Sequence, residues 1–66
     1  MLHLTKREYE VCKCIALGMR NSEIADKLFI STHTVKVYVS AVIEELNAKN
    51  RTQVAYLIGR LNIIEP

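Results

Sequence analysis

The sequence predicts a small all-α protein in which four short helices pack as a four-helix bundle-like domain. Apolar residues recur at intervals of three and four, the period of a helix with one buried face. Polar residues that can cap a helix precede these segments, and the chain has only two glycines and one proline to interrupt them. The expected helices span about residues 6–17, 22–29, 32–46 and 51–61.

Length and composition fit one globular domain, residues 1–66. Half of the residues are hydrophobic, which is too many for a disordered chain. No apolar run approaches the roughly 20 residues that a membrane span requires, and no signal-peptide pattern is present. We therefore expect a cytoplasmic protein with no membrane partner. The net charge of +2 is only a weak indication of a nucleic-acid partner.

The first helix is expected to begin after Thr5. Thr5 and Glu8 have the spacing of a capping box, and Leu4 can pack back against the first turn. Gly18 can end the helix in a left-handed conformation. The expected buried stripe of this helix consists of Val11, Cys12, Ile15 and Ala16.

The two cysteines of this helix, Cys12 and Cys14, are two residues apart and therefore point to different faces. They cannot bond to each other without breaking the helix, and no histidine has the spacing to complete a metal site. We expect one small core residue, one free thiol, no metal and no other cofactor. Because no phosphate loop and no nucleophile–base pair is recognisable, we do not expect an enzyme.

The second helix is expected to be capped by Asn21 or Ser22 and to last only about two turns. Phe29, Ile30 and Ser31 then form a short connection to the third helix. Two helices joined by such a turn predict a helix-turn-helix. Because Phe29 stands where these turns often have glycine, either its backbone adopts a positive φ or the turn differs slightly from the usual one.

The third helix has two contrasting faces, and Ser31 is its expected N-cap. Its apolar stripe consists of Val35, Val39, Val42 and Leu46. The opposite face contains His33, Val37, Ser40, Ala41 and Glu44, with Lys36 on its flank. An ordinary solvated face has more charges than this one. A face with one base and an exposed methyl-bearing side chain suits insertion into the major groove of DNA.

The fourth helix is expected to begin after a break at residues 47–50, where Asn47 can end the third helix and Asn50 pairs with Gln53 in a capping-box pattern. The side chains expected to face inward are Val54, Leu57, Ile58 and Leu61. Those expected to face outward are Thr52, Tyr56 and Gly59, with Ala55 at the border. A tyrosine among small residues predicts a closely approached contact surface. The alternative is a single exposed tyrosine on a monomer.

Glu8 and Arg51 are opposite charges that each lie against an apolar stripe. Since buried charges must be paired, we expect a structural ion pair between them. The alternative is that Glu8 only completes its capping box while Arg51 extends to solvent.

These segments together closely resemble the LuxR-type (GerE-type) DNA-binding domain, the helix-turn-helix output module of many response regulators and quorum-sensing regulators. The resemblance extends from Leu4 to about Leu61 and rests on many ordered positions. The matching segments are LTKRE at residues 4–8, ALG at 16–18, NSEIA at 21–25, LFIS at 28–31, TVKV at 34–37, and Arg51.

The resemblance implies a homodimeric transcription regulator that binds double-stranded DNA, with the third helix in the major groove and the fourth helix at the dimer contact. The residues expected at base edges are Lys36, Val37, Ser40 and His33. The residues expected at phosphates are Thr34, Tyr38, Asn21, Ser22 and Lys49. The residues expected in a weak dimer, stabilised on DNA, are Thr52, Ala55, Tyr56 and Gly59. Members of this family usually also contain a receiver or ligand-sensing domain, so the chain is either a stand-alone member or an excised piece.

A second function class remains open, a protein-interaction module of the same fold with weak or no DNA binding. The low net charge and the neighbouring carboxylates Glu44 and Glu45 favour it, because carboxylates repel phosphates. Lys36, the uncharged outer face and the capped start of the third helix favour DNA. A salt series of duplex binding separates the two classes.

Overall fold

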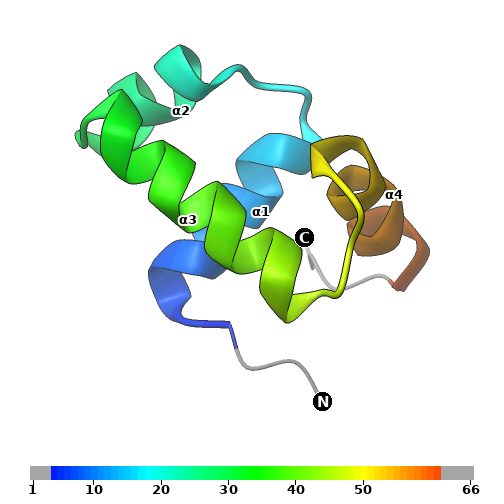
Figure 1. The fold of residues 1–66 in the computed structure, drawn as a ribbon. Coiled ribbons are helices and arrows are strands. Elements are labelled where there is room, and N and C mark those ends of the chain that lie inside the picture. Colours follow the sequence, from blue (N-terminus) through cyan, green and yellow to red (C-terminus); the bar gives the residue numbers. More distant parts are fainter. Residues whose placement is uncertain (1–3, 62–66) are drawn as a thin grey trace.

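The computed structural model describes residues 4–61, apart from the side chain of Leu61. These residues form four helices and no strand, so the predicted all-α class is confirmed (Figure 1). The helices are α1 (Lys6–Ala16), α2 (Asn21–Leu28), α3 (Thr32–Glu45) and α4 (Arg51–Leu61). Each boundary lies within one residue of the expected position.

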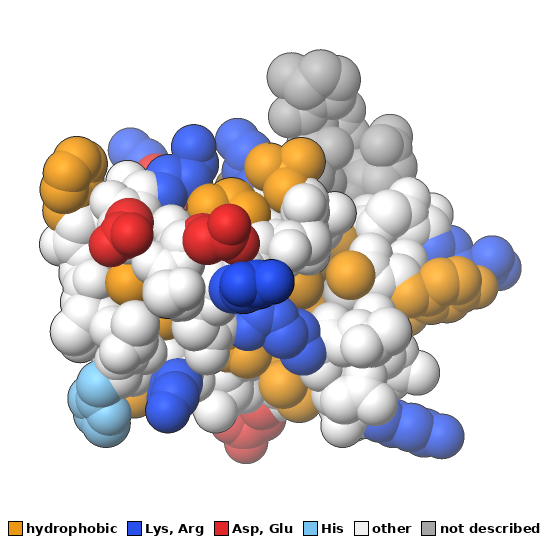
Figure 2. All heavy atoms as spheres, turned by 90° about the horizontal axis from the view of Figure 1, so that it is seen from above, with side chains coloured by type: hydrophobic (Ala, Val, Ile, Leu, Met, Phe, Trp, Pro, Cys, Tyr) orange, Lys and Arg blue, Asp and Glu red, His pale blue; other side chains and the backbone are white. Residues whose placement is uncertain are grey.

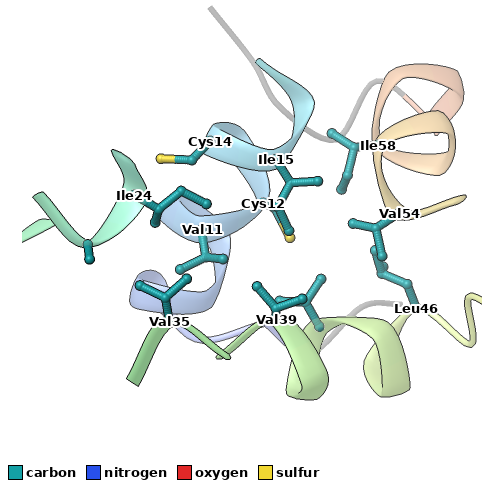
Figure 3. Close-up of a cluster of buried hydrophobic side chains, with 12 residues drawn as sticks. Val11, Cys12, Cys14, Ile15, Ile24, Val35, Val39, Leu46, Val54 and Ile58 are labelled. Atoms are coloured by element: carbon teal, nitrogen blue, oxygen red, sulfur yellow. The ribbon is translucent and has the colours of Figure 1, made fainter. Parts of the chain in front are cut away.

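The helices surround one core. α1 packs against both α3 and α4, and α2 packs against α3, which lies across the front of the molecule in Figure 1. Side chains from all four helices meet between them (Figure 3). The buried residues are Val11, Cys12, Cys14, Ile15, Ile24, Ala25, Val35, Val39, Val42, Leu46, Val54 and Ile58.

Two of the predicted helix caps are confirmed. At α1 the Thr5 hydroxyl accepts from the Glu8 backbone N–H at 3.1 Å, and the Glu8 carboxylate accepts from the Thr5 N–H at 2.9 Å. At α3 the Ser31 hydroxyl accepts from the Thr34 N–H at 3.0 Å. Each bond satisfies a backbone donor that has no partner within the helix. Both helix starts are therefore fixed by residues three positions apart.

At α4 the predicted capping box forms in an altered arrangement. Asn50 accepts from the Gln53 backbone N–H at 2.9 Å, as expected. The Gln53 side chain, however, accepts from the N–H of Lys49 at 2.6 Å and not from that of Asn50. The longer reach ties the end of the α3–α4 connection to the first turn of α4.

The start of α2 corrects the sequence analysis, because Arg20 and neither Asn21 nor Ser22 is the N-cap. The Glu23 carboxylate accepts from the Arg20 backbone N–H at 2.7 Å. Asn21 is the first helical residue, and its side-chain oxygen accepts a hydrogen bond from Arg51 instead of capping the helix. A partner 30 residues away in the sequence thus takes the group that local spacing assigned to the cap.

Both cysteines are free thiols and both are buried in the core, whereas only one of them was expected there from the sequence. Cys12 is 0% exposed and Cys14 is 2% exposed, whereas Ala16 is exposed. Burial, with a smaller contribution from the Glu8 carboxylate, raises the pKa of Cys12 to about 11. Burial also raises the pKa of Cys14. Both side chains therefore remain neutral thiols and pack as small apolar residues.

Two non-glycine residues that flank α3 have left-handed backbones, and at Phe29 this is the first of the two expected alternatives. Phe29, between α2 and α3, has φ 59°, and Asn47, after α3, has φ 53°. Asparagine accepts this conformation more readily than phenylalanine. Phe29 is also 93% exposed, so packing does not compensate for its backbone conformation.

Candidate nucleic-acid interface

The outer face of α3 is exposed as its periodicity predicts. His33, Lys36, Ser40 and Glu44 are all exposed, and Ala41 is half-buried. Val37 is 55% exposed, although it lies on the same helix as three buried valines. The outer face of α3 therefore presents the side chains of Lys36, Val37, His33 and Ser40 to solvent. No other element of the described chain covers this face.

The first turn of α3 is held in place by a small hydroxyl network. The Ser31 and Thr34 hydroxyls lie 2.9 Å apart, in addition to the bond from the Thr34 N–H to Ser31. Thr34 is half-buried, and Tyr38 one turn later is half-buried against the core. The Tyr38 side chain therefore packs against the core, although Tyr38 lies next to the outer face of α3. This network fixes the capped start of α3.

Three further candidate phosphate contacts lie on other elements. Ser22 in the first turn of α2 and Lys49 before α4 are exposed, and Asn21 is half-buried. The structure joins the starts of α2 and α4, because Arg51, the first residue of α4, donates to the Asn21 side-chain oxygen and to the backbone carbonyl of Met19. Sequence reasoning missed this junction, since no local spacing indicates a contact between residues so far apart.

The predicted ion pair between Glu8 and Arg51 is wrong. The Glu8 carboxylate is occupied by the Thr5 N–H in the capping box, and the Arg51 guanidinium is occupied by Asn21 and Met19. The capping-box alternative is correct for Glu8. The solvent alternative is not correct for Arg51, because both of its bonds are partly buried.

Charged side chains of both signs are interspersed on one face of the molecule. Figure 2 views the side on which α2 lies and shows lysine and arginine side chains among acidic and uncharged ones. They do not merge into one continuous basic patch on the part of this face that the structure describes. A face of this kind provides few long-range attractions to a polyanion, so it favours a partner that is bound by short-range contacts.

The outer face of α4 presents Thr52, Tyr56 and Gly59 to solvent, with Ala55 half-buried. Tyr56 is 60% exposed, and a Cβ built at Gly59 meets no atom within 4 Å. The predicted orientation of this helix is therefore confirmed for the described side chains. Beside this face lies a shallow hollow of about 240 Å³. The hollow is lined by Ile15, Gly18, Met19, Arg51, Thr52 and Ala55.

The described part of the chain contains neither a cluster of metal ligands nor a helix that could span a membrane. Histidine, cysteine and carboxylate side chains form no group of three or more that could hold a metal ion within residues 4–61. No helix in that range combines the length and the apolar character needed to cross a membrane.

The chain matches known proteins over nearly its whole length. The family model of bacterial regulatory proteins, luxR family, matches residues 2–58. The uncharacterized transcriptional regulatory protein YxjL of Bacillus subtilis (strain 168) is 44% identical over 61 residues, which cover 92% of this chain and 28% of YxjL. The transcriptional regulatory protein LnrK of the same organism is 47% identical over 63 residues, covering 96% of this chain and 29% of LnrK. The oxygen regulatory protein NreC of Staphylococcus carnosus (strain TM300) is 42% identical over 50 residues, covering 76% of this chain and 23% of NreC.

This chain spans less than a third of the length of each of these relatives. The family model nevertheless covers all of α1, α2 and α3 and most of α4, so the match includes the helix-turn-helix, the outer face of α3 and the outer face of α4 except Gly59. By its sequence and its fold, the chain belongs to the luxR family of bacterial regulatory proteins.

Proposed function

We propose that this chain binds double-stranded DNA in a sequence-specific manner, as the DNA-binding domain of a transcription regulator. The observation that carries the proposal is the outer face of α3, which is exposed, low in charge and begins at a capped helix end. An α-helix fits the major groove, and its first turn approaches the DNA backbone. The names of the relatives, which describe transcriptional regulatory proteins, support the same function.

In this proposal α3 enters the major groove. Lys36 donates to a guanine edge, Val37 contacts a thymine methyl group, and His33 and Ser40 contact neighbouring base edges. The phosphate contacts are Thr34, Tyr38, Asn21, Ser22 and Lys49. These contacts come from three elements, so they would fix the position of α3 along the duplex while α3 itself selects the sequence.

A salt series tests this function against the alternative of a protein-interaction module. The chain is titrated with a selected operator duplex and with a random duplex from low to physiological salt. We expect affinity for both to fall as salt rises, with the operator bound more tightly throughout. Absence of duplex binding even at low salt contradicts the proposal and supports the interaction module, which the exposed Glu44 favours.

We further propose a weak homodimer through the outer face of α4. One recognition helix reads only a few base pairs, so useful specificity requires two copies on one duplex. A symmetric dimer brings the same surface of both copies together. The surface consists of Thr52, Ala55, Tyr56 and Gly59. The exposed tyrosine supplies apolar area, and the hollow beside Thr52 and Ala55 offers room for a side chain of the second copy. Because α4 has only 11 residues, the dimer should be weak in solution and stabilised on DNA.

Substitution of Gly59 tests the dimer. A Cβ at this position has free space within the monomer, so both Gly59→Glu and the control Gly59→Ala should fold, as measured by circular dichroism. Gly59→Glu places two like charges in the symmetric contact and should abolish cooperative binding to paired half-sites, whereas Gly59→Ala should preserve it. Cooperative binding by Gly59→Glu would show that the dimer forms elsewhere.

The relatives suggest a larger regulator. Each is more than three times as long as the segment that it shares with this chain. We propose that the DNA-binding domain works together with a receiver or ligand-sensing domain in the cytoplasm. Co-purification of the full regulator, followed by footprinting with and without phosphorylation, would distinguish a receiver domain from a ligand-sensing one.

A further inference from the structure

The junction between α4 and α2 has a consequence for how Asn21 is oriented. The guanidinium of Arg51 donates from one nitrogen to the Asn21 side-chain oxygen and from the other to the Met19 carbonyl, at 2.5 Å. Met19 belongs to the α1–α2 connection, and Asn21 is the first residue of α2. Two bonds to one planar group restrict its rotation, so the arginine holds the Asn21 side chain in one position.

The chemistry of the contact also decides which end of the Asn21 amide faces inward. A guanidinium has only donors, so the atom that faces it must be the oxygen. The amide nitrogen, with its two N–H donors, is then on the side away from Arg51. That nitrogen has no hydrogen-bond partner within residues 4–61. Asn21 is half-buried, so part of the residue remains open to solvent, and the neighbouring Ser22 is exposed.

We propose that Arg51 is a positioning residue for DNA binding, which turns the amide donors of Asn21 toward a DNA phosphate. This inference rests on the proposed function and deepens it, because it assigns a role to a residue that does not itself touch DNA. A free asparagine amide presents oxygen or nitrogen with equal ease, and its oxygen is repelled by a phosphate. Fixing the oxygen against a cation removes the unfavourable orientation before DNA arrives, so less conformational entropy is lost on binding.

The principal test is Asn21→Asp, which separates the fold from the DNA contact. The carboxylate still accepts from Arg51 and is favourable in the first turn of a helix, so the melting temperature should stay the same or rise. The donor is lost and a negative charge faces the phosphate. We therefore expect affinity for the random and the operator duplex to fall by about tenfold or more, as for the loss of one hydrogen bond to a charged group. Unchanged affinity with unchanged stability would overturn the inference.

A second pair of variants shows whether Arg51 acts through Asn21. Arg51→Lys keeps the charge but cannot hold two acceptors in the same plane. It should lower DNA affinity severalfold when Asn21 is present and have no further effect in an Asn21→Ala background. Equal losses in both backgrounds would mean that the arginine acts only through the general fold, and the inference would be wrong. The side-chain amide resonances of Asn21 provide a direct readout, since they should shift on addition of duplex in the unmodified chain and lose this response in Arg51→Lys.

The unmodified chain in the same titrations keeps this inference distinct from the proposed function. If it binds no duplex, the proposed function itself fails. If it binds duplex and Asn21→Asp binds equally well, only the role of Arg51 and Asn21 fails. Asn21→Ala should also leave the salt dependence unchanged, because a neutral amide displaces no counterion. Lys49→Ala is the matched control, and its salt slope should be lower by about one.

Discussion

The two faces of α3 contain the same residue type in opposite environments. Val39 is 8% exposed and packs in the core, whereas Val37, two positions earlier, is 55% exposed. Helical periodicity alone assigns both, since successive residues are about 100° apart. The inner face is determined by packing against α1 and α2, so its residues must be apolar and of suitable size. Residues on the outer face do not have to be apolar to pack in the core. The exposed Val37 on that face is therefore better explained by a binding partner than by packing.

The largest expected effect tests this comparison directly by truncating both valines. Val39→Ala leaves a cavity between α3 and α1 and should lower the free energy of unfolding by about 2–3 kcal/mol. Val37→Ala opens no cavity and should change it by less than about 0.5 kcal/mol. Chemical denaturation of both variants measures the difference in stability. In DNA titrations of the two folded variants, Val37→Ala should lose more affinity than Val39→Ala. Equal destabilisation would mean that the two faces of α3 have been assigned incorrectly.

The second prediction concerns the only base on the flank of the outer face. Lys36→Ala should weaken operator binding by about 1–2 kcal/mol if the lysine contacts a guanine edge. If it contacts only phosphate, operator and random duplex should weaken alike. Lys27→Ala is the matched control, because Lys27 is also exposed but lies at the end of α2 beside α1. Equal losses for the two lysines would show that only total charge matters and that the outer face of α3 does no reading.

The third prediction extends the comparison to the turn before α3. Phe29 is left-handed and 93% exposed, so neither its backbone nor its side chain stabilises the fold. Phe29→Gly should raise the free energy of unfolding by about 0.5–1 kcal/mol, after allowance for the greater freedom of glycine in the unfolded chain. Asn47→Gly should raise the free energy of unfolding by less, because asparagine already tolerates the left-handed conformation. A loss of stability in Phe29→Gly would mean that the exposed ring has a stabilising contact after all.

The sequence predicted those features that depend on neighbours three or four residues apart. The Thr5 and Ser31 caps, the left-handed Phe29 and Asn47, and the valine stripe of α3 are all of this kind. Each follows from a local rule about hydrogen bonds or helical period, and the rest of the fold does not compete with it.

The features that sequence reasoning missed depend on partners that are distant in the chain. Asn21 has a good capping side chain, but Arg51 occupies its oxygen, and the N-cap moves to Arg20. Cys14 lies outside the stripe that α1 turns to α3 and α4, yet it is buried beside Lys27 and Leu28 of α2. A single period cannot show that a helix is covered on two sides. The DNA contacts are harder still to predict from local sequence rules, because they depend on a partner outside the chain.

The smallest expected effect concerns the far end of the outer face, where Glu44 is exposed. If the outer face of α3 lies along DNA, this carboxylate approaches the phosphates and limits nonspecific affinity. Glu44→Gln should then tighten binding to random duplex by a few tenths of a kcal/mol at low salt, and the gain should disappear as salt screens the charge. Glu10→Gln is the control, because Glu10 lies on α1, behind α3 in Figure 1, and is paired with Arg7 at 3.3 Å. The control removes the same charge from the chain as a whole, so any gain that it shares with Glu44→Gln reflects net charge alone. A gain confined to Glu44→Gln locates the end of α3 near the backbone, and no gain at low ionic strength would place that end away from DNA.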